Sequence, residues 1–156
     1  QGKEGRIGQR LLAIVAEGPR GRVYLPPTTH HDEVARQAVP EWSPDVKFFE
    51  QALGFRVGNY GMSKWSDLFT TRQLTSLATL SDLIDKVKDQ AALDATATGF
   101  KKDGISLAAG GCGATAYGEA VSVYLTCALG KTADYNSANS SRISGGQTIR
   151  NTFGRI

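Results

Sequence analysis

Long hydrophobic runs are absent from this sequence, and histidine, cysteine and methionine are scarce. No apolar run approaches the roughly 20 residues of a membrane-spanning helix, and no secretory leader pattern is recognisable, so we expect a cytoplasmic chain without a membrane partner. The two histidines and two cysteines form no recognisable nucleophile set and no disulfide framework. Such sparse cysteine use is typical of a reduced, intracellular compartment.

A strong charge of one sign is also lacking. The formal net charge is +3, from 18 basic and 15 acidic residues, which is too small to predict a nucleic-acid partner by itself. The C-terminal region is less balanced, because Asp134 is the sole acid from position 131 onward. The basic residues there are Lys131, Arg142, Arg150 and Arg155. A tail of this kind is typical either of a solvated surface or of a phosphate contact.

The length of 156 residues is enough for one domain with a buried core. The chain opens on Gln1 and its single methionine is Met62, so we expect an excised or processed piece. Residues 1–10 show no apolar pattern and are interpreted as a linker or an expression remnant. Residues 11–156 are predicted to form a single domain.

Two β-prone runs, residues 11–16 and 22–25, surround a Gly/Pro cluster, which is the pattern of a β-hairpin. Because a two-stranded hairpin is marginal alone, we expect it to pack on helices or on another part of a larger protein. Residues 30–38 are predicted to form a short helix. Residues 39–59 are predicted to be an irregular connection, and such a long loop is typical of a segment lying over another surface.

The first long helix is predicted to begin at Thr70, because Thr70 and Gln73 have the spacing of a capping box. Apolar residues then recur at intervals of three and four, at Leu77, Leu80, Ile84, Val87 and Ala91. Gly99 is the expected stop.

A second helix is predicted over residues 114–133, after a glycine-rich break at 110–113 that we interpret as mobile. Its apolar side is marked by Tyr117, Val121, Tyr124, Leu125, Ala128 and Leu129. Because it carries little charge, we expect it to be central and buried on most of its faces. A polar loop at 136–146 and a final short helix at 147–153 complete the prediction, an α+β fold, mainly α-helical, with an N-terminal β-hairpin packed on a small helical bundle.

Three local patterns contain the residue types of known sites but lack the remaining chemistry. Leu25-Pro26-Pro27-Thr28 has the two prolines of the amino-methyltransferase motif, without its side-chain oxygen or its aromatic. Residues 30–33 (His-His-Asp-Glu) have no third ligand at a metal-binding spacing. Residues 110–113 precede a helix whose N–H groups favour an anion, yet the usual preceding strand is weak. We therefore predict no catalytic residue, metal or cofactor in this chain.

Positive charge beside an aromatic, typical of a nucleic-acid surface, occurs just before the first long helix. The candidate contacts are Lys64, Trp65, Arg72 and Gln73. In the competing interpretation Trp65, Leu68 and Phe69 form a hydrophobic anchor and the charges are ordinary surface. The usual burial of large apolar residues favours the anchor.

Four stretches, in this order, resemble a family of large bacterial and archaeal adenine-specific DNA methylases. The stretches are DLFTTRQL at 67–74, TAY with AV and YL within 115–125, ADYNS at 133–137 and IRNTFGR at 149–155. The family is named for an N-terminal domain of unknown function, and some members carry a zinc-ribbon insert. Together with a looser match of the N-terminal hairpin, the resemblance covers most of the chain.

The resemblance implies an S-adenosylmethionine-dependent DNA adenine methyltransferase as the parent protein. In that family this region lies between the glycine loop that binds S-adenosylmethionine and the Asp-Pro-Pro-Tyr motif that holds the target amine. Neither is in this sequence, so the resemblance implies a non-catalytic accessory domain. An independent enzyme finds no support in the residues.

Two roles for this accessory domain stay open. In the first it contacts DNA. The expected phosphate contacts are Arg142, Arg150, Asn151 and Arg155, with a contribution from Lys64, Trp65 and Arg72. In the second it braces the two catalytic halves of the parent and has no ligand of its own. The second role predicts an exposed apolar surface on the isolated piece, and hence self-association.

Overall fold

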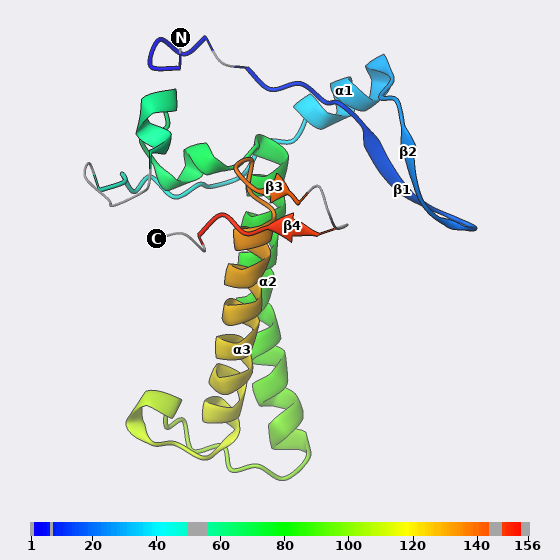
Figure 1. Ribbon diagram of the computed structural model, residues 1–156. Coiled ribbons are helices and arrows are strands. Elements are labelled where there is room, and N and C mark those ends of the chain that lie inside the picture. The colour runs from blue at the N-terminus through cyan, green and yellow to red at the C-terminus, as the bar shows by residue number, and fades with distance from the viewer. Residues whose placement is uncertain (1, 7, 50–55, 144–147, 154–156) are drawn as a thin grey trace. The chain divides into compact units, whose positions relative to one another are not determined.

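The computed structural model describes residues 2–6, 8–49, 56–143 and 148–153, in which helices predominate (Figure 1). The described residues fall into two compact units, one up to Thr75 and the other Ser76–Phe153. We call them unit 1 and unit 2. The mainly α-helical α+β fold with an N-terminal antiparallel hairpin is confirmed. The packing of that hairpin on the helices stays a prediction.

Unit 1 begins with the hairpin of β1 (Ile14–Gly18) and β2 (Gly21–Leu25), which pair antiparallel from Ile14↔Leu25 to Gly18↔Gly21. Helix α1 (Thr29–Arg36) follows. Its N-terminus is capped reciprocally, since the His31 N–H donates to Thr28 Oγ1 and the Thr28 N–H donates to His31 Nδ1. The irregular connection then leads to two short 3₁₀ helices, η1 (Val57–Tyr60) and η2 (Trp65–Leu68).

Helix α2 (Thr71–Ala97) starts and stops where local capping predicts. The Thr70 N–H donates to Gln73 Oε1 over 2.8 Å, and the Gln73 N–H donates to Thr70 Oγ1 over 3.2 Å, which is the expected capping box. At the other end Gly99 has φ +100°, its N–H bonds to the Thr96 carbonyl and the Phe100 N–H bonds to the Ala95 carbonyl. This pattern is a Schellman motif, for which glycine is favoured.

Helix α3 (Ala114–Tyr135) runs antiparallel to α2 within unit 2 (Figure 1). The two helices approach closely at Gly118, where an added Cβ would lie 2.5 Å from the Lys88 carbonyl oxygen and 3.1 Å from Ala92 Cβ. The ring of Tyr117 lies 5.3 Å from that of Phe100, just past the end of α2. Gly118 therefore sets the distance and the register between the two helices.

The glycine-rich segment before α3 packs closely against neighbouring backbone, while its interpretation as a mobile break stays a prediction. A Cβ on Gly111 would lie 2.2 Å from the Ile105 carbonyl oxygen, and a Cβ on Gly113 would lie 2.5 Å from both the Lys101 carbonyl and Asp103 Oδ1. Glycine is thus required by the approach of neighbouring backbone. The Asp103 carboxylate also places negative charge at the start of α3, which disfavours the alternative in which these N–H groups bind an anion.

Two further expectations are corrected. The segment predicted as a final helix, 147–153, instead contains β4 (Ile149–Arg150), which pairs antiparallel with β3 (Ser141–Arg142) from the predicted loop; position 147 lies outside the described residues. Its backbone forms hydrogen bonds with other segments and not within a helical turn. The Thr152 N–H, for example, donates to the Asp134 carbonyl. In addition, α3 is not buried on most of its faces, because Tyr124 is 79% exposed and Val123 53%.

Candidate functional site

One side of the α2–α3 hairpin carries a row of exposed, uncharged side chains. On α2 the residues turned toward α3 are half-buried, among them Leu77, Ile84 and Ala91. With 100° between successive residues, the next flank of α2 carries three apolar side chains. These are Leu80, Leu83 and Val87, which are 44%, 43% and 41% exposed.

Helix α3 repeats this arrangement. Its half-buried row includes Val121, Leu125 and Leu129. The neighbouring flank presents Tyr117 and Tyr124, seven residues apart, which are 47% and 79% exposed. Because the helices are antiparallel and Gly118 fixes their register, both flanks belong to the same side of the hairpin. We call Leu80, Leu83, Val87, Tyr117 and Tyr124 the apolar face.

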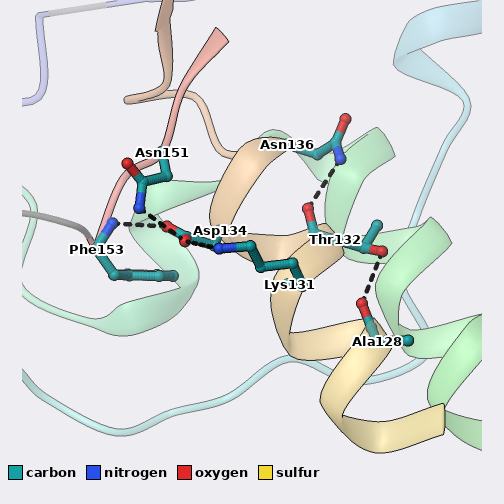
Figure 2. Close-up of polar contacts among 7 residues, drawn as sticks. All are labelled: Ala128, Lys131, Thr132, Asp134, Asn136, Asn151 and Phe153. Carbon is teal, nitrogen blue, oxygen red and sulfur yellow. Dashed lines mark hydrogen bonds and ion pairs between the residues drawn. The ribbon is translucent and has the colours of Figure 1, made fainter. Parts of the chain in front are cut away.

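A buried carboxylate organises the other end of unit 2, where α3 ends (Figure 2). Asp134 is 9% exposed. Its carboxylate accepts from the Phe153 N–H over 2.7 Å and from Asn151 Nδ2 over 3.1 Å, and Lys131 Nζ lies 3.8 Å away (Figure 2). The Phe153 N–H is the main cause that lowers the pKa of Asp134, assisted by Asn151 and Lys131 and opposed by burial.

Ser137 extends this arrangement, which we call the Asp134 cluster. Its side chain is almost completely buried, and its hydroxyl shares a hydrogen bond with that of Thr152. The Asn139 N–H donates to Ser137 Oγ as well. The cluster therefore joins the ADYNS and IRNTFGR stretches and fixes the segment after β4 against the end of α3. Sequence reasoning missed this contact, although the isolation of Asp134 among basic residues was visible.

The C-terminal DNA-contact candidates differ in their exposure and in their hydrogen bonds. The Asn151 amide is committed to Asp134. Arg150 is exposed in β4 and stands opposite Ser141, while Arg142 occupies the position in β3 opposite Ile149. Arg155 lies outside the described residues. Arg150 is therefore the candidate whose exposed position fits a contact with an external anion.

The candidates in unit 1 are mostly engaged with their own neighbours. Lys64 Nζ forms an ion pair with the Asp45 carboxylate. This bond raises the pKa of Lys64 and lowers the pKa of Asp45. The Trp65 ring is half-buried and makes an edge contact with Phe48, with 4.9 Å between centroids. The alternative in which this segment is a hydrophobic anchor is the one that these contacts favour.

Residues of the DLFTTRQL stretch are also engaged with their own neighbours. The Asp67 carboxylate accepts from the backbone N–H groups of Ser63 and Lys64, at 2.7 and 2.9 Å. Leu68 is fully buried, and the Gln73 side chain caps α2. Arg72 is exposed. Most of the residues that carry the family resemblance here thus stabilise local structure, whereas the exposed Arg72 has no such local role among the bonds described.

The remaining chemistry-bearing residues do not converge. Among the described residues, no three His, Cys, Asp or Glu side chains lie close enough to hold a metal ion. Cys112 and Cys127 are free and exposed. No helix in the described part of the chain is both long and apolar enough to span a membrane.

Comparisons of the chain with protein-family models, with curated proteins and with solved structures find no match. The residues and their geometry are therefore the basis of the functional argument.

Proposed function

We propose that this chain is a non-catalytic accessory module of an S-adenosylmethionine-dependent DNA adenine methyltransferase, and that its apolar face docks on the catalytic halves of that protein. The observation that carries this proposal is the apolar face itself, from Leu80 to Tyr124 on one side of the α2–α3 hairpin. Contiguous exposed apolar side chains mark interaction sites on soluble proteins. The link to a methylase comes from the four resembling stretches alone.

The magnitude of the burial is sufficient for such a contact. A half-exposed Leu, Val or Tyr gains roughly 1 kcal/mol when the remainder of its side chain is covered. The five residues of the apolar face thus provide on the order of 5 kcal/mol before the cost of ordering them. A contact within one polypeptide needs less than a contact between free molecules, because the linkage gives a high effective concentration.

Chemistry would come from the rest of the parent protein. The Asp134 cluster is closed by its own hydrogen bonds, and Asp67 and Gln73 are used in capping. We propose no catalytic role for them and no cofactor held by this chain. S-adenosylmethionine would bind to the parent methylase elsewhere.

The test is to produce the flanking parts of the parent methylase as separate chains and to titrate this module into them by calorimetry. The variant Leu83→Lys with Tyr124→Lys places two charges on the apolar face and should weaken binding at least tenfold. Leu93→Lys with Val123→Lys is the matched control, since both residues are exposed, on the same helices, and outside the face. Equal affinity of both variants would refute docking through this face.

A second candidate function, contact with DNA, is favoured by the exposure of Arg150 beside the Asp134 cluster. An exposed arginine is well suited to a phosphate. Binding of a short duplex should fall as salt rises, with a slope of about −0.9 per phosphate contact. It should also weaken in the variant Arg142→Ala, Arg150→Ala, Arg155→Ala. Fluorescence anisotropy at two salt concentrations measures both effects. An affinity that does not change with salt concentration would exclude this role.

A further inference from the structure

The turn of the β1–β2 hairpin concentrates positive charge at a narrow end. The strands meet at the Gly18↔Gly21 pair, so Pro19 and Arg20 form the turn between them. Arg22 follows Gly21, and both arginines are exposed. Gly21 has φ +116°, a conformation that glycine adopts most readily. We call Gly18–Arg22 the tip.

The tip is narrow because glycines flank the turn. A Cβ on Gly18 would lie 3.0 Å from Val23 Cγ1 and 3.1 Å from the Gly21 carbonyl oxygen, so no larger residue fits there without displacement. Within the tip the long side chains are those of the two arginines. A two-stranded ribbon of this kind matches the width of the DNA major groove.

Charge and apolar surface are separated along the hairpin. Toward the base, Val15, Tyr24 and Leu25 are exposed, whereas the tip has no large apolar side chain. In the part of the chain that the structure describes, neither Arg20 nor Arg22 forms an ion pair. Glu17 is the nearest acid by register, since it stands opposite Arg22 across the hairpin. The base is therefore suited to contact protein, and the tip to contact an anion.

We propose that the tip is a DNA-binding element in which Arg20 and Arg22 contact the phosphates of duplex DNA. A guanidinium group binds a phosphate through two parallel hydrogen bonds. Two exposed arginines therefore fit a defined phosphate contact better than a diffuse basic surface does. A membrane surface is disfavoured because the tip offers no large apolar side chain to insert among lipids. The choice of DNA as the polyanion rests on the proposed methylase parent, while the site itself is independent of the apolar face and of Arg150.

The test uses the whole chain and a short fluorescent DNA duplex, titrated by anisotropy at two or more salt concentrations. Arg20→Ala with Arg22→Ala should weaken binding about tenfold or more at low salt. It should also reduce the salt slope by nearly 2, since each phosphate contact contributes roughly 0.9. The matched control is Arg6→Ala with Arg36→Ala, which removes the same charge from residues already paired with Glu4 and Asp32. The control should change the salt slope little.

A substitution that strengthens binding separates a DNA contact from a structural effect. Glu17 places a negative charge opposite Arg22, so Glu17→Gln should increase affinity for the duplex several-fold and leave the hairpin intact. Circular dichroism checks that each variant is folded. Unchanged or weaker binding in Glu17→Gln, with the fold retained, would overturn the proposed contact.

Other outcomes show which of the proposals is wrong. Loss of binding in the variant Arg142→Ala, Arg150→Ala, Arg155→Ala, with no change in Arg20→Ala with Arg22→Ala, would overturn DNA contact by the tip and leave it in the C-terminal region. Absence of duplex binding at low salt would overturn both DNA sites and leave the docking proposal standing. Tip-dependent binding to phosphatidylserine vesicles without binding to DNA would also overturn the proposal and assign the arginines to a membrane surface.

Discussion

The two sides of the α2–α3 hairpin contain similar residues and have opposite environments. On the inner side Gly118 lies against the Lys88 carbonyl, and Ile84 and Leu125 are half-buried in the row between the helices. On the outer side Leu83 and Tyr124 belong to the same helices and remain exposed. The comparison shows that close approach of small residues selects which apolar row folds the hairpin. The other row stays exposed.

The largest effect on folding should come from the Asp134 cluster, which joins the end of α3 to the segment after β4. Asp134→Ala leaves the Phe153 N–H and the Asn151 amide without their acceptor, so the free energy of unfolding should fall by about 2–3 kcal/mol. Asp134→Asn keeps one acceptor and should lose less. Urea unfolding measures both, and hydrogen exchange should locate the loss in residues 148–153. An effect spread evenly over α2 and α3 would contradict the assignment.

The packing of the inner side is tested at Gly118. Gly118→Ala places a methyl group on the Lys88 carbonyl, and the free energy of unfolding should fall by about 1–3 kcal/mol. Gly130→Ala is the matched control in the same helix, because an added Cβ there meets no atom within 4 Å. That change should stabilise α3 by up to about 1 kcal/mol, through the higher helix propensity of alanine. Thermal unfolding in which both variants shift alike would argue against close packing at Gly118.

A smaller effect should appear in the pH dependence of stability. The folded pKa of Asp134 is lowered below its ordinary value of 3.8, so the carboxylate stabilises unit 2 at pH values above the unfolded pKa. This contribution is lost as pH falls below about 4 toward the folded pKa. Unfolding by urea from neutral pH to pH 3 should therefore show a weaker acid sensitivity in Asp134→Asn than in the wild type. Identical profiles would exclude Asp134 as a contributor.

The outer side should contribute least to folding. Leu83→Lys and Tyr124→Lys alter exposed positions, so each should change the free energy of unfolding by no more than about 0.5 kcal/mol. The same changes should reduce self-association of the isolated chain, which sedimentation velocity at several concentrations measures. A large loss of stability would mean that these side chains belong to the core and not to an interaction surface.

Local chemistry made part of this structure predictable. The Gly/Pro turn marked the N-terminal hairpin, and the caps at Thr70 and Gly99 marked both ends of α2. These elements depend on residues a few positions apart, which a sequence displays directly.

Features that depend on distant residues were not predictable in this way. The segment 147–153 was interpreted as helical. Its contact with Asp134 joins residues far apart in the sequence, so no local pattern revealed that contact. Periodicity showed that α3 has an apolar side but not what covers it, so Tyr124 was expected to be buried. Likewise the charge of Lys64 was visible, while its pairing with Asp45 was not. The candidate interaction surfaces are therefore the part of the molecule that the sequence specifies least.

The most direct test of the docking proposal compares side-chain exposure in the isolated chain and in the proposed parent methylase, by hydroxyl-radical labelling and mass spectrometry. We predict that Leu83 and Tyr124 become strongly protected in the methylase, while Leu93 and Val123, outside the apolar face, keep their reactivity. Undiminished labelling of Leu83 and Tyr124 in the methylase would contradict docking through this face.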